Sequence, residues 1–360
     1  MFGMAKGETV TPDRVTRDSS DSGVSRRALV KTLATAGAAA VISAGGLIAQ
    51  ATRDATKRGR IDVHHHMLPA FQDGGNRNWT PQVSLDAMDK FGVETAILSV
   101  TMAPCCGVAD LLYAGDEKAN ALARRYNEYG AKVVSDHPKR FGFMMCLPLM
   151  DTDATLKEIA YAYDVLKADG VGVFSNTGEK WLGDPKFIPI FQELNRRKAV
   201  IFIHPSVAKC CRTLIPGVGT GVVEFDFDTT RTVVSLLYSG RLSQNPDIRF
   251  IINHSGAAVP TLAGRIKDEL RGDPQHVAPN GAFAELTKLY YECAHATYPA
   301  PMAATTTFAP TSQLLFGTDF PIWPYETTVS LIPALKLSPE TQYALDRGNA
   351  ELLFPRWKAI

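Results

Sequence analysis

Short apolar runs alternate with longer amphipathic stretches from about residue 60 to the end of the chain. The apolar runs are rich in β-branched and aromatic residues, which is typical of strands buried on both faces. They predict strands at 60–66, 94–102, 140–149, 170–176, 199–205, 249–255, 288–295 and 313–319. The stretches between them predict helices at 84–91, 117–135, 154–168, 187–197, 229–239, 261–270 and 339–353. This alternation predicts an α/β fold, a closed (β/α)8 barrel of the TIM type.

An open, doubly wound sheet would produce the same alternation of strands and helices. That fold usually carries a glycine-rich phosphate-binding turn after its first strand, and the sequence has none there. Candidate ligands at the ends of the first, fifth, sixth and eighth strands also converge more easily in a ring. We therefore expect one catalytic barrel domain over residues 60–360.

The N-terminal part has a different composition. Residues 1–24 are polar and predicted to be disordered. Adjacent arginines, Arg26-Arg27, precede 19 uncharged residues from Thr32 to Gln50. This pattern predicts a twin-arginine-type export signal over 25–51, followed by a linker over 52–59. We expect export to a periplasmic or other extracytoplasmic space by the twin-arginine machinery. An uncleaved N-terminal membrane anchor is the alternative, because the uncharged segment is near spanning length.

The charge balance argues against a nucleic-acid partner. Lys plus Arg number 38 and Asp plus Glu number 37, and 45% of the residues are hydrophobic. No basic stripe is visible that could neutralise phosphates. The composition is typical of a globular enzyme that acts on a small molecule.

Three of the predicted strands end in residues that bind metals. His64 and His66 are two residues apart, so on a strand they share the inward face while His65 points the other way. His204 ends the fifth strand and Asp319 follows the eighth. Three imidazoles and a carboxylate suit Zn²⁺ and, with added water, Mn²⁺ or iron. We expect one divalent metal ion, with Zn²⁺ favoured over Mn²⁺.

Further candidates stand at other strand ends. His254 closes the sixth strand and is either another ligand or a general acid/base beside the metal; the second role is favoured, because four ligands already suffice. A hydrogen-bonded core histidine is the ordinary alternative. His295 could face the substrate or have a structural role. Trp181, Phe320 and Trp323 could form an aromatic wall or simply pack at the barrel mouth.

Together these motifs resemble the decarboxylase branch of the amidohydrolase superfamily. That branch includes aminocarboxymuconate-semialdehyde, γ-resorcylate and 6-methylsalicylate decarboxylases, and residues 138–205 are most similar to the last. The resemblance covers roughly residues 60–355. The motifs that carry it are His64-x-His66 with Leu68-Pro69, His204-Pro205, Asn253-His254-Ser255-Gly256, Gly317-Thr318-Asp319-Phe320-Pro321 and Asn349-Ala350-Glu351-Leu352-Leu353-Phe354.

The resemblance implies a metal-dependent, non-oxidative decarboxylase of a small aromatic or unsaturated carboxylic acid, such as a hydroxybenzoate. It implies the same four metal ligands, with His254 in the catalytic role. Our hypothesis for the reaction is that Asp319 or His254 delivers a proton to the carbon that bears the carboxylate. The resemblance also implies a homodimer, in which Arg265 binds substrate in the neighbouring subunit's site; an ordinary surface arginine is the alternative. A one-metal hydrolase, such as a lactonase or amidohydrolase, or a hydratase is the rival activity. The predicted fourth strand lacks the lysine of many two-metal hydrolases.

Two pairs of adjacent cysteines lie in predicted loops near the barrel mouth. Cys105-Cys106 follow the second strand and Cys210-Cys211 follow the fifth. An exported protein meets an oxidising compartment, so one disulfide between the two loops is a hypothesis. Free thiols or additional metal-binding sulfur are the alternatives.

Overall fold

The computed structural model describes residues 59–72, 78–101, 107–270 and 274–358. The predicted disordered N-terminus, the export signal over 25–51 and nearly all of the linker lie outside these ranges. Within them, no helix combines the length and the apolar character that crossing a membrane requires.

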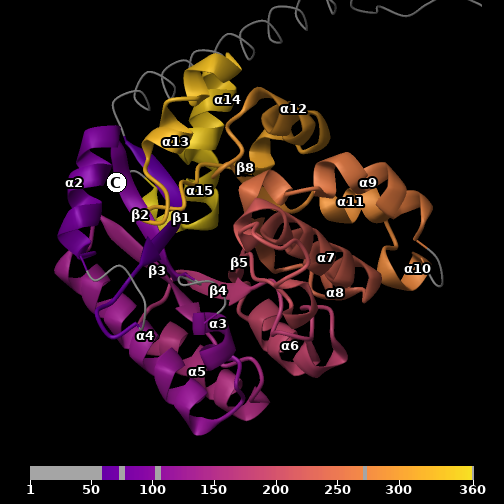
Figure 1. Ribbon diagram of the computed structural model, residues 1–360, viewed down its shortest axis with the longest axis horizontal. Coiled ribbons are helices and arrows are strands. Elements are labelled where there is room, and N and C mark those ends of the chain that lie inside the picture. The colour runs from indigo at the N-terminus through magenta and orange to yellow at the C-terminus, as the bar shows by residue number, and fades with distance from the viewer. Residues whose placement is uncertain (1–58, 73–77, 102–106, 271–273, 359–360) are drawn as a thin grey trace, which may run out of the picture. The chain divides into compact units, whose positions relative to one another are not determined.

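Eight parallel strands lie at the centre of the fold (Figure 1), and each pairs with the next in chain order. The first and last segments also meet, since Val63 N donates to Phe316 O at 3.0 Å and His66 N to Phe320 O at 2.7 Å. The predicted (β/α)8 barrel is therefore confirmed. The strands are β1 (Arg60–Met67), β2 (Val93–Val100), β3 (Phe141–Cys146), β4 (Gly170–Phe174), β5 (Val200–His204), β6 (Arg249–Ile252), β7 (Tyr290–Glu292) and β8 (Leu314–Leu315).

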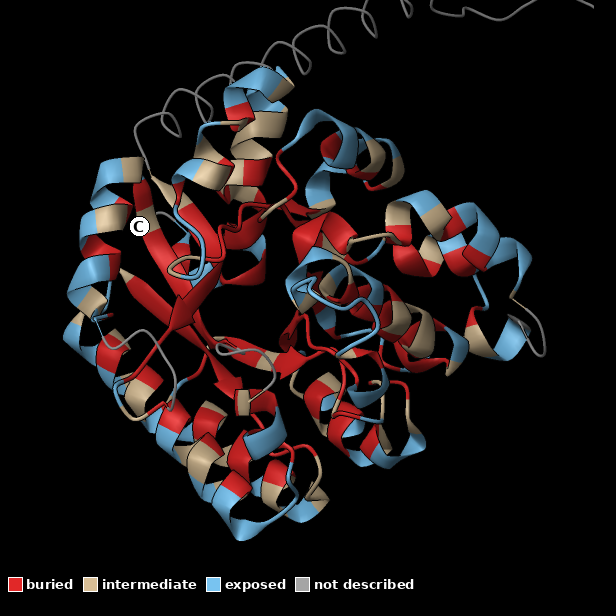
Figure 2. Ribbon diagram, viewed as in Figure 1, coloured by how far each residue is buried: buried red, intermediate tan, exposed pale blue. Residues whose placement is uncertain are grey.

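Helices surround the strands and bury one stripe each, as Figure 2 shows by the exposed outer faces. Capping residues stabilise the helix ends. In α2, the Thr80 side chain accepts from Val83 N at the start, and Gly92 ends the helix in a left-handed backbone conformation. The described helices are α2 (Pro81–Phe91), α3 (Gly107–Leu112), α4 (Glu117–Asp136), α5 (Thr152–Asp164), α6 (Ile188–Arg196), α7 (Glu224–Tyr238), α8 (Arg241–Gln244), α9 (Val259–Asp268), α10 (Pro274–Val277), α11 (Ala282–Leu286), α12 (Pro299–Phe308), α13 (Glu326–Val329), α14 (Pro339–Tyr343) and α15 (Asn349–Leu353).

Several predicted boundaries differ from the structure. The predicted helix at 339–353 is divided into α14 and α15 by a π-helical turn at Ala344–Gly348. The predicted strands at 288–295 and 313–319 are shorter in the structure, where β7 ends at Glu292 and β8 ends at Leu315. The backbone then turns out of the sheet, and His295 (φ 58°) and Asp319 (φ 64°) adopt left-handed conformations. These left-handed turns direct both side chains toward the mouth of the barrel instead of continuing the pleat.

Apolar side chains fill the core of the fold, and polar side chains lie at the carboxyl ends of the strands. One buried cluster joins Ile61 and Val63 of β1 to Phe202 of β5 and to Leu353 and Trp357 near the C-terminus. The remaining buried side chains pack between the strands and the surrounding helices. Apolar packing inside the barrel and between the strands and helices therefore supports the strands, whose ends carry the candidate site.

Candidate active site

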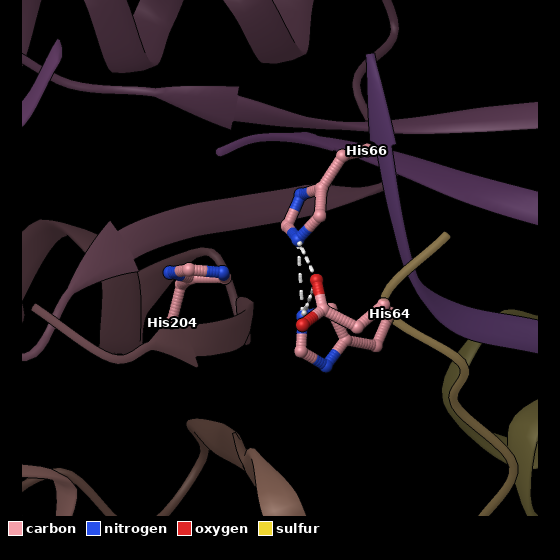
Figure 3. A group of neighbouring side chains, drawn as sticks. His64, His66 and His204 are labelled. Atoms are coloured by element: carbon pink, nitrogen blue, oxygen red, sulfur yellow. Dashed lines mark hydrogen bonds and ion pairs between the residues drawn. The ribbon is translucent and has the colours of Figure 1, made fainter. Parts of the chain in front are cut away.

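The four predicted metal ligands lie together, although they come from distant parts of the chain. The donor atoms of His64, His66, His204 and Asp319 all lie within 4.8 Å of one another. The Nε2 atoms of His64 and His66 are 3.1 Å apart, and Asp319 Oδ1 is 2.8 Å from His66 Nε2. Figure 3 shows the three imidazole rings around one common space. All four side chains are buried, so their polar atoms need partners within the site.

The electrostatics of this group fit a divalent cation. Burial lowers the pKa of His66 and, with the neighbouring histidines, lowers the pKa of His204 well below its usual value, so both offer a free lone pair. Burial would raise the pKa of Asp319, but His64 and His295 hold it well below its usual range. Burial likewise opposes charge on His64, while Glu292 and Asp319 raise its pKa to about 10, so these carboxylates favour a positive charge here, and a bound cation would supply it in place of the ring proton. Three imidazoles and an ionised carboxylate are a donor set for zinc or manganese.

Each histidine is oriented through its second ring nitrogen. His64 Nδ1 lies 2.8 Å from Glu292 Oε1, and His66 Nδ1 lies 3.0 Å from Ser99 Oγ. His204 Nδ1 lies 2.8 Å from the carbonyl oxygen of Pro205. Such contacts fix the tautomer and aim each Nε2 at the common space.

Glu292 is a residue that the sequence reasoning missed. It ends β7 and is fully buried. Besides holding His64, its Oε1 accepts from the backbone N of His254 at 2.7 Å, and its Oε2 accepts from Ala294 N at 2.7 Å. The available signal was a carboxylate at the end of a strand-like run, Tyr290-Tyr291-Glu292. One carboxylate thus connects a metal ligand to the backbone of the candidate catalytic histidine.

His65 points away from the cluster, as the strand pattern predicts. Its Nε2 lies 2.8 Å from Ser84 Oγ on α2, and its Nδ1 lies 3.2 Å from Asp62 Oδ2. Asp62 also accepts from the Thr318 hydroxyl at 2.6 Å. This buried network joins β1 to α2 and to the segment after β8. It therefore supports the segments that carry candidate ligands, although none of the four ligands belongs to it.

His254 and His295 stand beside the ligand cluster. His295 Nε2 lies 2.9 Å from Asp319 Oδ2, while the other carboxylate oxygen faces His66. His254 Nε2 is buried, has no hydrogen-bond partner within the described part of the chain, and lies 4.0 Å from Asp319 Oδ2. The two rings are in edge contact, with centroids 4.9 Å apart. The structure thus brings both histidines to the carboxylate, outside the group of four ligands.

A cavity of about 570 Å³ opens above these residues. Its size is ordinary for a small-molecule site, which spans about 300–1,000 Å³. No lysine or arginine is among its described lining residues. The polar wall includes His204, His254, His295, Asp319 and Asp226. The apolar wall consists of Val222, Phe225, Ile322 and Trp323.

The other predicted substrate-binding residues lie elsewhere in this chain. The indole Nε1 of Trp181 donates to Asp228 Oδ1 at 3.0 Å, and Trp181 is not among the cavity-lining residues. Phe320 stacks on Tyr325, with centroids 4.9 Å apart, beside His65. Of the three aromatic candidates, Trp323 lines the cavity. Strand-end position alone did not distinguish them, because the loop path decides which ring turns inward.

Two further predictions concern residues away from the cluster. Arg265 is exposed on α9 and does not line the cavity of its own chain, so its reach into a neighbouring subunit stays a prediction. Cys105 and Cys106 lie outside the described residues, and their pairing also stays a prediction. The thiols of Cys210 and Cys211 are 2.9 Å apart.

Comparison with known proteins places this fold and site in a family. The family model described as "Amidohydrolase" matches residues 61–356, so the chain belongs to the amidohydrolase family. It is 34% identical to decarboxylase yanB of Aspergillus niger, over 83% of this chain and 88% of that protein. It is also 34% identical to 6-methylsalicylic acid decarboxylase of Penicillium expansum, over 84% and 98%. The resemblance to the decarboxylase branch is confirmed.

Solved structures share the fold. A crystal structure of 2,6-dihydroxybenzoate decarboxylase with bound 2,6-dihydroxybenzoate has a TM-score of 0.72 at 21% identity, covering 83% of this chain and 99% of that one. A dihydroxybenzoic acid decarboxylase from Polaromonas sp. with bound manganese has a TM-score of 0.72 at 20% identity, covering 84% and 98%. At these identities, the likeness establishes the barrel architecture.

Proposed function

We propose that this chain is a metal-dependent, non-oxidative decarboxylase of a small aromatic hydroxy acid, of the 6-methylsalicylate or dihydroxybenzoate type. The observation that carries the proposal is the buried group of His64, His66, His204 and Asp319 at the base of a cavity that also contains His254. The names of the 34%-identical relatives support the same reaction class. The donor set suits one divalent ion, with Zn²⁺ favoured and Mn²⁺ the alternative.

Loss of CO2 from an aromatic acid leaves negative charge on a ring carbon, which is the costly part of the reaction. A bound divalent ion would polarise the carboxylate and an adjacent hydroxyl of the substrate. The chain's own residues supply orientation and a proton. The apolar wall, including Phe225 and Trp323, holds the ring against the polar wall.

His254 is the favoured proton donor to the carbon that bears the carboxylate. Its Nε2 has no hydrogen-bond partner among the described residues, and His254 lines the cavity. Asp319 is the weaker candidate, because its pKa lies well below the usual range and keeps it ionised. General acid help of this kind contributes about 10²- to 10⁴-fold in rate. His254 therefore delivers a proton from Nε2 to the ring carbon, and the electron pair of the breaking carbon–carboxyl bond returns to the ring as CO2 leaves.

The test combines metal analysis with a CO2-release assay over hydroxybenzoates and related acids. We expect about one divalent ion per chain, CO2 release from at least one ortho-hydroxy acid, and a His254→Asn variant that keeps its metal but loses most turnover. A product that retains the carboxyl group would instead favour a one-metal hydrolase or hydratase. Near-normal turnover of His254→Asn would refute the acid assignment.

Homodimerisation is proposed with Arg265 as the residue that crosses to the neighbouring site. A guanidinium suits a substrate carboxylate, and the described cavity lining contains no lysine or arginine of its own. Mixing inactive Arg265→Ala and Asp319→Asn subunits tests this. Hybrid dimers regain activity in one site if Arg265 acts across the interface, and regain none if it acts within its own chain.

Export by the twin-arginine route is proposed from the segment over 25–51. Fractionation with N-terminal sequencing of the active protein checks it. Active protein found only in the cytoplasm, with residues 1–51 retained, would contradict export, and retention in the membrane fraction would favour the anchor.

A further inference from the structure

A second acidic residue reaches His254 from a different element. Asp226 lies in the first turn of α7 and lines the cavity. Its Oδ1 is 3.3 Å from His254 Nδ1, on the opposite edge of the ring from Asp319. The turn that follows His254 reads Ser255-Gly256-Ala257-Ala258 and contains no acidic side chain. The acidic partner of His254 Nδ1 therefore comes from a different element, α7.

Charged and titratable groups surround the His254 ring, and they differ between its two nitrogens. His64 stacks on one face, with centroids 5.5 Å apart, and His295 contacts the ring edge-on. Glu292 of β7 binds the backbone N of His254 and does not hold the imidazole. Asp319 lies on the Nε2 side at 4.0 Å, and Asp226 lies on the Nδ1 side. A proton held on Nδ1 by Asp226 leaves Nε2 directed at the substrate position.

Two threonines of α7 fix the helix against the turn that carries His254. The Thr229 hydroxyl donates to Asn253 Oδ1 at 2.9 Å. The Thr230 hydroxyl donates to the carbonyl of Asp226 at 2.8 Å and accepts from Ala258 N at 3.2 Å. Both threonines are buried. The distance between Asp226 and His254 is therefore set by hydrogen bonds on both sides of the histidine, and not only by the contact between the two side chains.

We propose that Asp226 is a positioning residue for the decarboxylation, which holds the His254 ring so that Nε2 delivers the proton to the ring carbon of the substrate. The inference rests on the proposed function and adds a residue to it. The arrangement follows the general logic of an acid–base histidine oriented by a third group. The Asp226 side chain is 53% exposed, so the pair contributes little to folding stability. We expect Asp226 to act instead on the orientation of the His254 ring relative to the substrate.

The experiment measures kcat, KM and metal content for Asp226→Asn and Asp226→Glu, with the hydroxybenzoate that the unmodified enzyme decarboxylates fastest. Asp153→Asn is the matched control, because Asp153 is an acidic residue in the first turn of α5 that does not line the cavity. It reproduces the loss of a carboxylate at a helix N-terminus. Asp226→Asn should lower kcat by about 10- to 100-fold, the cost of a misplaced reacting group, with KM and metal content unchanged.

Asp226→Glu should recover part of this loss, and Thr230→Val should show a smaller loss of kcat than Asp226→Asn. Asp153→Asn should retain the activity of the unmodified enzyme. A rise in KM at constant kcat would assign Asp226 to substrate binding and overturn the inference, as would an unchanged kcat. If the unmodified enzyme releases no CO2 from any acid, the proposed function fails and this inference fails with it.

Discussion

The ligand cluster and the apolar wall of the cavity differ in how far they are buried. His64, His66, His204 and Asp319 are at most 6% exposed, and buried hydrogen bonds hold the three rings. On the apolar wall, Val222 is 73% exposed and Trp323 is 46% exposed. Buried strand ends thus carry the candidate ligands, while more exposed loops at the carboxyl end of the barrel carry the residues that we propose to contact the substrate. The two regions can change independently, and the following predictions test that separation.

The largest effect is expected from loss of a ligand. His66→Ala should abolish metal binding and lower turnover by more than about a thousandfold, because several kcal/mol of transition-state stabilisation disappear. His65→Asn is the matched control, since His65 lies next in sequence but contacts Ser84 and Asp62. It should lower stability and keep the metal. Elemental analysis and CO2 release check both variants, and metal retained by His66→Ala would contradict the cluster.

Glu292→Gln should have the next largest effect. It keeps the shape of the side chain but removes the carboxylate that orients His64 and binds the backbone N of His254. Loss of such an outer partner lowers metal affinity or activity by about 10- to 100-fold. Competition with a chelator measures the affinity. Unchanged affinity together with unchanged turnover would show that His64 is oriented without Glu292.

A smaller and different effect is expected on the apolar wall. Trp323→Ala removes an aromatic contact worth about 0.5–1.5 kcal/mol, so KM should rise by roughly two- to tenfold. Metal content should stay the same, because the indole ring contacts His295, and the Trp323 backbone N, which donates to the Asp319 carbonyl at 3.1 Å, is kept in the variant. Steady-state kinetics with parallel metal analysis distinguish the two regions. Loss of metal in this variant would break the proposed separation.

The smallest effect concerns the most exposed part of the wall. Val222→Ser should change the free energy of unfolding by no more than about 0.5 kcal/mol, as for most surface substitutions. Val63→Ala is the contrasting variant, because Val63 is fully buried inside the barrel. It should cost about 2 kcal/mol through lost burial and a residual cavity. Denaturant unfolding measures both, and equal losses would show that the loop is part of the cooperative core.

Much of the architecture and of the ligand set can be predicted from sequence, because both depend on local regularities. A strand buried on both faces requires an apolar run, and the two-residue spacing of His64 and His66 places both on one face. Eight such runs alternating with helices indicate the barrel, whose strand ends converge at one mouth. His204 and Asp319 could therefore be assigned to the same place from their positions alone.

The tertiary structure alone decided which other side chains reach that place. Glu292 and Asp226 hold histidines through contacts between elements 228 and 28 residues apart, and no local pattern encodes such contacts. Among the three aromatic candidates, the loop path turned Trp323 into the cavity and left Trp181 bonded to Asp228. Periodicity determines the face of a strand on which a residue lies, because that is a property of neighbouring bonds. The direction of a side chain beyond the strand end depends on packing against distant segments, which only the folded chain brings together.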